Sequence, residues 1–343
     1  MTPRLLALGF LPRGGEFAPF ALLSTNTSLS QHHRRASPMN RLLLRMAALG
    51  LCLGVTGQAE ADYTFRTLNY PDSTFTEAHG INSFGHIVGA YDDVNHRRHG
   101  FLLIGDCYTS FDVLGSTLTG SGGINDSCEI VGRYINADGI QHGYKRLSDG
   151  ITYELLPDPP DGTSPEPYAI NNSGQIVGWY LAGGTTHAFL LSEGNYMRIE
   201  PSPGSPYTLA EGINNFGIIV GSYTDLAGRV HGYVRLSGGR FIYPPDVPDL
   251  ILTNTIGIND LGQISGTYRD ADGIRYGFVL EYGQYTTLHP PPGAMNVFAS
   301  GINTSGLIVG PYTEAATGRI YGYLATPLPE PGPGATSNCL GAQ

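Results

Sequence analysis

Residues 212–223 read Gly-Ile-Asn-Asn-Phe-Gly-Ile-Ile-Val-Gly-Ser-Tyr, and this stretch decides the fold because the chain repeats it. The shared pattern is G-I-N-x-x-G-x-I-V-G-x-Y, followed by a polar turn and a triplet similar to His-Gly-Phe. The six Asn residues of the pattern lie 43, 46, 43, 45 and 44 residues apart, at Asn82, Asn125, Asn171, Asn214, Asn259 and Asn303. A repeat of this length, rich in Gly and short apolar runs, predicts a β-propeller blade of four strands.

The two ends of the repeat region complement each other. Residues 63–71 resemble the fourth strand of a repeat, whereas the last copy, ending near Ala325, has three strands and no fourth. We therefore expect an all-β, six-bladed propeller over residues 62–326, closed by pairing the amino-terminal strand with the carboxy-terminal blade. Closure would remove exposed sheet edges. An open β-solenoid is the alternative, but it would not need complementary ends.

Composition supports a β-rich globular chain. The 343 residues include 48 Gly and 24 Pro, which argues against a helical bundle. An apolar content of 41% and 21 Tyr argue against disorder. With 29 acidic and 19 basic residues the net charge is −10, which argues against nucleic acid as the main partner.

Residues 1–61 are expected to direct export rather than to join the fold. From Met39 the chain has a basic start, an apolar run over 46–55 and an Ala-Glu-Ala site that ends at Ala61. This is the pattern of a secretory signal peptide that starts at Met39 and is cleaved after Ala61. Residues 1–38 are an upstream extension or a misread start. We expect the mature protein to lie outside the cell or in the cell envelope, the periplasm included, with no transmembrane segment.

The cysteines fit an exported protein. Cys107 and Cys128 lie 21 residues apart in adjacent repeats, and an oxidising compartment would allow a disulfide between them. Cys339 is left in residues 327–343, a Pro- and Gly-rich tail that we expect to be disordered.

The repeated polar residues favour structural roles. Four repeats carry a His in the triplet, at His99, His142, His187 and His231. The other two carry Tyr276 and Tyr321, and metal ligands do not exchange freely with Tyr, so each His is expected to bind a turn or backbone group in its own blade. The six Asn residues suit turns, where Asn bonds its own backbone. We predict no metal and no cofactor. The Tyr that ends each pattern is either a packing residue between blades or part of a sugar-stacking surface.

Residues that do not repeat are the better candidates for binding. They include Arg97 and Arg98, which would hold an anionic group, and Trp179, the only Trp. No catalytic motif is present, and we assign no catalytic residue. The sequence thus predicts a monomeric, secreted, non-enzymatic binding or adhesion module for a polysaccharide or a protein. The alternative is a glycosidase or lyase, because catalytic carboxylates on a propeller need no proximity in sequence. That alternative requires carboxylates with raised pKa values clustered at one mouth of the ring.

The repeat also resembles the HAF-repeat family of extracellular bacterial proteins. The triplet that gives the family its name is intact once, at residues 187–189, and the other copies read His-Gly-Phe, His-Gly-Tyr, Tyr-Gly-Phe or Tyr-Gly-Tyr. The resemblance covers residues 63–326 and implies a secreted, propeller-like protein without an agreed biochemical activity. Some family members end in a Pro-Glu-Pro sorting signal; residues 329–331 match it, but the apolar helix and basic end that follow it are missing here.

Overall fold

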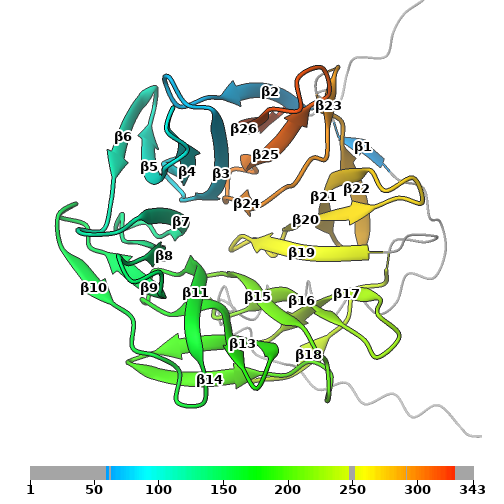
Figure 1. Ribbon diagram of the computed structural model, residues 1–343. Helices are drawn as coiled ribbons and strands as arrows, with labels where there is room; N and C mark the ends of the chain where they lie inside the picture. The colour runs from blue at the N-terminus through cyan, green and yellow to red at the C-terminus, as the bar shows by residue number, and fades with distance from the viewer. Residues whose placement is uncertain (1–58, 62, 247–251, 291, 329–343) are drawn as a thin grey trace, which may run out of the picture. The chain divides into compact units, whose positions relative to one another are not determined.

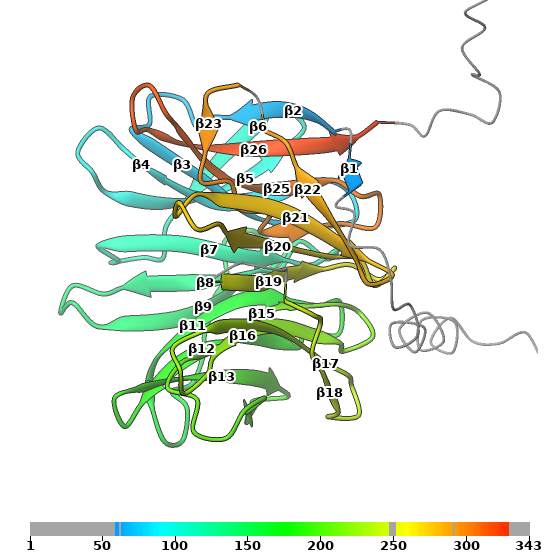
Figure 2. The same ribbon diagram turned by 90° about the vertical axis from the view of Figure 1, so that its right-hand side faces the viewer.

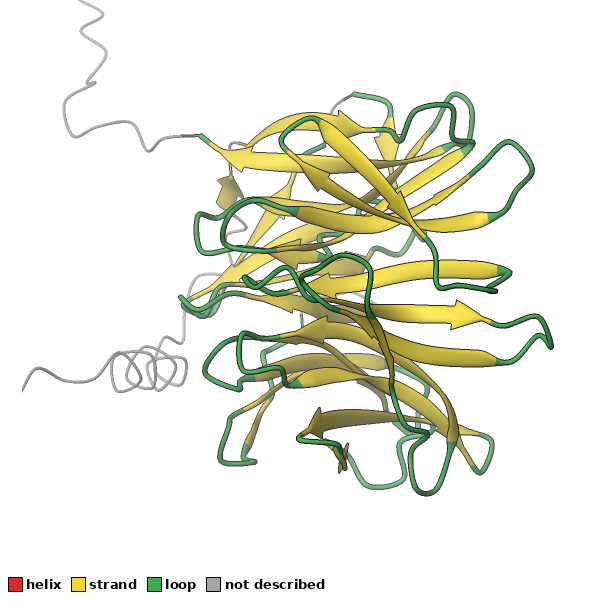
Figure 3. Ribbon diagram, turned by 90° about the vertical axis from the view of Figure 1, so that its left-hand side faces the viewer, coloured by secondary structure: helices red, strands yellow, loops and turns green. Residues whose placement is uncertain are grey.

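The computed structural model describes residues 59–61, 63–246, 252–290 and 292–328. All of them belong to one compact unit, residues 38–343. Every helix or strand within these ranges is a β-strand (Figure 3), so the all-β prediction is confirmed. The predicted signal peptide up to residue 58 and the tail from residue 329 lie outside the described residues. Ala59–Ala61 forms strand β1, which pairs in parallel with β22 (Gln284–Leu288).

The repeats form antiparallel sheets of four strands, here called blades. The first three blades are β3 (Phe75–Ile81), β4 (Ile87–Asp92), β5 (Arg98–Ile104) and β6 (Cys107–Phe111); β7 (Leu118–Ile124), β8 (Ile130–Ile135), β9 (Gln141–Arg146) and β10 (Tyr153–Leu155); β11 (Thr163–Ile170), β12 (Ile176–Ala182), β13 (Thr185–Ser192) and β14 (Asn195–Ile199). The next two are β15 (Thr208–Ile213), β16 (Ile219–Thr224), β17 (Val230–Arg235) and β18 (Phe241–Ile242); β19 (Leu252–Ile258), β20 (Ile264–Arg269), β21 (Arg275–Glu281) and β22. One parallel pair, Val230 with Leu252, joins these two blades and β1 into a single sheet.

The last sheet combines the two ends of the described chain. Its strands are β23 (Ala294–Met295), β24 (Gly301–Ile302), β25 (Ile308–Glu314), β26 (Ile320–Pro327) and β2 (Tyr63–Leu68). Strand β2 runs antiparallel to β26, with Tyr63 opposite Pro327 and Leu68 opposite Gly322 (Figure 2). This is the pairing that the complementary ends of the repeat region predict.

The strand that carries the G-I-N sequence is the innermost strand of each sheet. Figure 1 shows β3, β7, β11, β15, β19 and β24 around a common centre, with the later strands of each sheet farther out. The Gly of Ile-Val-Gly explains how closely the first two strands approach. A Cβ added at Gly89 would lie 1.9 Å from the Glu77 carbonyl oxygen of the neighbouring strand.

The six repeated Asn residues link the inner turns into a ring. Each is 3–4% exposed, and its Nδ2 donates a hydrogen bond to the backbone carbonyl of the next repeated Asn. The donor–acceptor distances are 2.9–3.2 Å, and the last bond runs from Asn303 back to the carbonyl of Asn82 at 3.0 Å. Each Oδ1 also accepts bonds in its own turn, as Asn171 does from the N–H groups of Ser173 and Gln175.

Aromatic side chains fill the space between the sheets. The third residue of each His-Gly-Phe triplet is at most 1% exposed, at Phe101, Tyr144, Phe189, Tyr233, Phe278 and Tyr323. Cores also span neighbouring blades: Val88 of β4 packs in one cluster with Tyr144 of β9. The Tyr that ends each pattern stacks on or tilts against the first residue of the triplet, as Tyr91 does on His99 at 5.1 Å between ring centroids. Four of these six Tyr are buried, so they belong to the packing and do not form an open sugar-stacking ring.

The predicted disulfide between Cys107 and Cys128 is wrong, because both are free thiols. Cys107 begins β6, the outermost strand of its blade, whereas Cys128 lies in the turn after β7, an innermost strand. The width of a blade therefore separates them. At Cys128 the backbone φ is 60°, in the left-handed region where the other repeats carry Gly.

The Asn ring makes a prediction about stability. Asn171→Ala removes two bonds accepted from the backbone N–H groups of Ser173 and Gln175 and two donated bonds, to Gln175 Oε1 and to the Asn214 carbonyl. The Asn214 carbonyl then keeps only the bond from the Gly217 N–H. We expect a loss of about 2–4 kcal/mol in the free energy of unfolding. Urea unfolding measures it.

The matched control is Ser173→Ala in the same turn. Ser173 is exposed, and only its backbone N–H is used in the turn. A change within about 0.5 kcal/mol is expected there. Equal effects of the two substitutions would contradict a stabilising role for the Asn ring.

Candidate functional site

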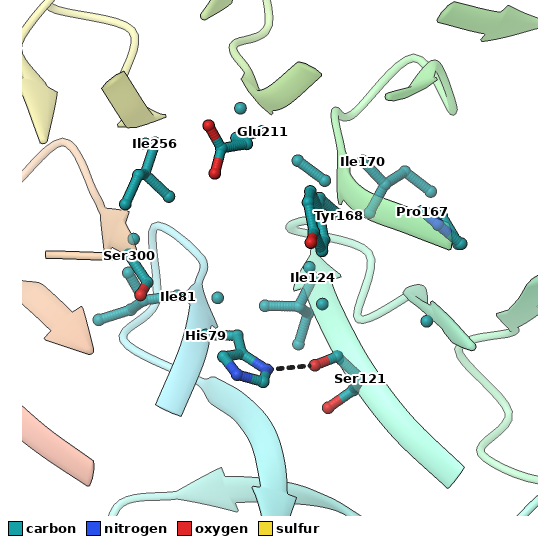
Figure 4. A pocket seen from close by; sticks show the side chains of 18 of the residues that line it. His79, Ile81, Ser121, Ile124, Pro167, Tyr168, Ile170, Glu211, Ile256 and Ser300 are labelled. Carbon is teal, nitrogen blue, oxygen red and sulfur yellow. Dashed lines mark hydrogen bonds between the residues drawn. The ribbon is translucent and has the colours of Figure 1, made fainter. Parts of the chain in front are cut away.

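A cavity of about 420 Å³ lies between the innermost strands and is lined by residues of all six repeats. Most of the polar part of its wall comes from positions three and five residues before the repeated Asn, because alternate residues of a strand face the same side. Leu209, five residues before Asn214, is the exception and is buried outside the cavity. The side chains at these positions differ from blade to blade. They include Glu77, His79, Glu166, Tyr168, Glu211, Asn254, Ile256, Phe298 and Ser300. Figure 4 labels His79, Tyr168, Glu211, Ile256 and Ser300 among them.

The first polar cluster of the cavity is built on His79 of β3. His79 Nδ1 lies 2.6 Å from the Ser121 carbonyl oxygen, so this nitrogen carries a proton and donates it. His79 Nε2 lies 3.2 Å from Glu77 Oε2. Burial opposes the charge of the imidazole, but the Glu77 carboxylate and the Ser121 carbonyl outweigh it and raise the pKa of His79. Burial likewise opposes the charge of Glu77, but His79, Arg98 and Arg133 outweigh it and lower its pKa.

The second cluster joins Glu166 of β11 to the preceding blade. Arg133 Nε lies 3.2 Å from Glu166 Oε1, and Gln141 Nε2 donates to Glu166 Oε2 at 3.5 Å. Arg133 also donates to Gln141 Oε1 at 3.0 Å, so the three side chains hold one another. Burial nevertheless raises the pKa of Glu166, against the opposing charges of Arg133 and His79.

Glu211 of β15 differs from the other two acids in the cavity. Glu211 Oε2 accepts a hydrogen bond from Ser222 Oγ at 3.0 Å, and no ion pair involves Glu211 among the described residues. Burial raises its pKa to about 7, against a smaller opposing effect of the Ser222 hydrogen bond. Tyr168 of β11 lies near both acids: burial, and then the charges of Glu166 and Glu211, raise the pKa of its hydroxyl.

The three binding residues proposed from the sequence take different places. Arg98 lines the cavity; its Nε lies 2.8 Å from Asp92 Oδ1 and its guanidinium lies 4.5 Å from the centre of the Phe75 ring. Arg97 is not among the lining residues, and its Nη2 donates to the Ser116 carbonyl at 3.0 Å. Trp179 is one strand away from the wall, on β12 opposite Glu166. The structure therefore brings only Arg98 of the three to the cavity.

The repeated His residues contact polar groups of their own blades. His99 Nδ1 lies 2.8 Å from Asp112, His142 Nε2 lies 3.3 Å from Asn136 Nδ2, His187 Nε2 lies 2.6 Å from Thr185 Oγ1, and His231 lies 2.8 Å from Asp246 and 3.1 Å from Asp225. Among the described residues no group of three or more His, Cys, Asp and Glu side chains is arranged to hold a metal ion.

The sequence analysis missed the cavity acids and His79, although a signal for them exists in the repeat. The Asn, Gly and Ile of G-I-N hardly vary, whereas the residues three and five positions earlier are different in nearly every copy. Variation at fixed positions of an otherwise repeated strand indicates side chains that the packing of the blades does not require. Only the ring arrangement shows that these positions face one another.

Comparisons with known proteins support the fold. No family model and no curated protein matches the sequence. TolB from Acinetobacter baumannii is similar in structure, with a TM-score of 0.51 and 13% identity; the match covers 71% of this chain but only 64% of that TolB chain. A putative TolB from Agrobacterium tumefaciens gives a TM-score of 0.50 and 12% identity over 80% of this chain and 100% of that chain. The β-propeller domain of the trilobed protease from Pyrococcus furiosus gives 0.44 and 11%, over 75% and 84% of the two chains. At these identities the likeness to the two TolB structures is one of fold alone.

The opposite pKa shifts of Glu211 and Glu77 predict opposite effects on stability. The pKa of Glu211 in the folded chain lies above its unfolded value. The free energy of unfolding therefore falls as the pH rises through about 7 and Glu211 becomes ionised in the folded chain. Above that pH, the free energy of unfolding of Glu211→Gln should therefore exceed that of the parent chain by up to about 3 kcal/mol. Near pH 4 the two free energies of unfolding should be about equal.

Glu77→Gln provides the matched comparison. The pKa of Glu77 is lowered, so its carboxylate stabilises the fold above its unfolded pKa, and the variant should be less stable than the parent chain at neutral pH. Urea unfolding from pH 4 to pH 9 measures both. A destabilised Glu211→Gln at pH 8 would contradict the assignment of Glu211 as a buried acid without a cation.

Proposed function

We propose that this chain is a secreted, non-catalytic binding module that holds one sugar residue of an extracellular polysaccharide in the cavity between the inner strands. The observation that carries the proposal is the cavity wall itself. All six repeats contribute to it, and it collects polar side chains that the repeat pattern does not require.

The size and chemistry of the cavity favour a small polar group over a flat protein surface. Pockets of about 300–1,000 Å³ suit small ligands, whereas protein partners need extended interfaces. Sugar hydroxyls both donate and accept hydrogen bonds. They match the mixed set of His79, Glu77, Asn254 and Ser300, while Tyr168 provides an aromatic face for the apolar side of a sugar ring.

A closed six-bladed ring is part of the proposal. It is supported by the antiparallel pairing of β2 with β26 and by the Asn hydrogen bonds that return from Asn303 to Asn82. In such a ring the cavity occupies the central channel. The arrangement of the blades would then hold the lining residues rigidly, which lowers the entropic cost of binding.

Secretion rests on the predicted signal peptide ahead of Asp62, and the HAF-repeat resemblance agrees with it. Within the described part of the chain, no helix is long and apolar enough to cross a bilayer.

The first experiment is a glycan-array screen of the full chain, followed by the best glycan against variants. Tyr168→Ala and His79→Ala should each weaken binding at least about tenfold, because each removes a contact surface of the cavity. Tyr282→Ala is the matched aromatic control, since Tyr282 is 57% exposed and lies outside the cavity. It should bind like the parent chain. An array without hits, or equal losses in all three variants, would refute the proposal.

The second candidate function is glycoside hydrolysis or lyase cleavage, and one observation favours it. Glu166 and Glu211 both carry raised pKa values on neighbouring inner strands, with Tyr168 near both, and a carboxyl protonated near neutral pH can act as a general acid. Incubation of the array-selected glycan with the chain, followed by mass spectrometry, distinguishes the two. Cleavage that Glu211→Gln abolishes, with binding retained, would establish the enzyme; an intact glycan supports the binding module.

A further inference from the structure

Glu211 is the acid in the cavity whose charge is not balanced by the protein. Glu77 has His79 at 3.2 Å and Glu166 has Arg133 at 3.2 Å, whereas the hydrogen-bond donor to Glu211 among the described residues is the neutral Ser222 hydroxyl. A buried carboxylate without a cation is unfavourable unless a partner is supplied. The remaining space of the cavity lies in front of this carboxylate, as Figure 4 shows.

The surroundings of Glu211 are aromatic and apolar. Figure 4 shows its carboxylate directed inward between Tyr168 on one side and Ile256 on the other, with His79 and Ser121 across the cavity. Tyr168 and Ile256 occupy, on the two neighbouring inner strands, the repeat position that Glu211 occupies on β15. The Glu211 carboxylate therefore lies beside an aromatic ring, and His79 lies across the cavity from it.

A carboxylate next to an aromatic ring in a cavity, without a cation of the protein beside it, is a combination that recognises a protonated amine. The carboxylate accepts charge-assisted hydrogen bonds from the ammonium, and the face of an aromatic ring attracts a cation. A divalent metal ion is a poorer match, because calcium needs six to eight oxygen ligands and this end of the cavity supplies one carboxylate and one hydroxyl. The acidic net charge of −10 also favours the approach of cationic ligands.

We propose that the end of the cavity formed by Glu211 and Tyr168 binds the ammonium group of an amino sugar. This inference rests on the proposed function, which it narrows from sugars in general to sugars that carry a free amine. In it the amine pairs with the Glu211 carboxylate, while the hydroxyls of the same ring face Glu77, His79 and Ser300 across the cavity.

Calorimetry on the full chain with glucosamine, N-acetylglucosamine and glucose tests the inference. These three sugars differ at one carbon, which carries an ammonium, a neutral amide or a hydroxyl. Glucosamine should bind at least about tenfold more tightly than the other two at pH 7, where its amine is mostly protonated, because only it can balance the Glu211 charge. Glu211→Gln should remove this preference. Glu193→Gln, at an exposed turn outside the cavity, is the matched control and should keep the preference.

Proton release on binding is a second readout of the inference. Binding an ammonium at pH 7 should drive Glu211 to its ionised form and release protons, which calorimetry in buffers of different ionisation enthalpy detects. Tyr168 on β11, Tyr207 ahead of β15 and Tyr233 on β17 lie around Glu211 and stay neutral, because their pKa values are raised. Glu166 and His79 line the same cavity, and their pKa values are raised as well. Glu211→Gln should abolish the release, which a purely structural role of Glu211 would not predict.

The outcomes separate this inference from the proposed function. Array hits confined to sugars without a free amine, or equal binding of the three test sugars, would overturn the amine site and leave the binding module standing. An array without any hits would overturn the binding module and the amine site with it.

Discussion

The hydrogen bond from one Asn amide to the backbone carbonyl of the next repeated Asn is the interaction on which the rest of the structure depends. It occurs six times at 2.9–3.2 Å and returns to its starting residue. The same side chain ties down its own turn through Oδ1, so one buried amide satisfies a local turn and a contact to the next blade. Buried amides are costly when unpaired, and this double use explains why the position does not vary within the chain.

Because the repeated residues stabilise the blades, the residues that face the cavity can differ from one blade to the next. The inner strands need their Asn, Ile and small residues for turns and for close approach between blades, as Gly89 shows against the Glu77 carbonyl. The alternate positions face the cavity and carry no such constraint. Charged groups can gather there because the packing of the blades supplies the stability that their burial costs, and two of the three acids also find cations within the protein.

The three acids show how placement sets chemistry in one cavity. Glu77 beside His79 has a lowered pKa, Glu166 has a raised pKa despite Arg133, and Glu211 without a cation titrates near 7. Residues of one type, on the same strand of three blades, thus differ through burial and neighbouring charge alone. A ligand that meets them encounters one carboxylate without a cation, at Glu211, and two that are paired, at Glu77 and Glu166.

The all-β class, the repeat length and the pairing of the two end strands follow from the sequence alone, because every blade packs in the same way and the same pattern of residues occurs six times. The sequence also separated repeated structural residues from unique ones, but it selected Arg97 and Trp179 because they were conspicuous in type, and neither lines the cavity. It paired Cys107 with Cys128 by distance along the chain, which says nothing about the width of a blade. The cavity and its acids follow only from the three-dimensional arrangement, because Glu77, Glu166 and Glu211 lie more than 40 residues apart and meet only where the inner strands surround a common space. Burial in that space is also what shifts their pKa values, and no stretch of sequence shows it.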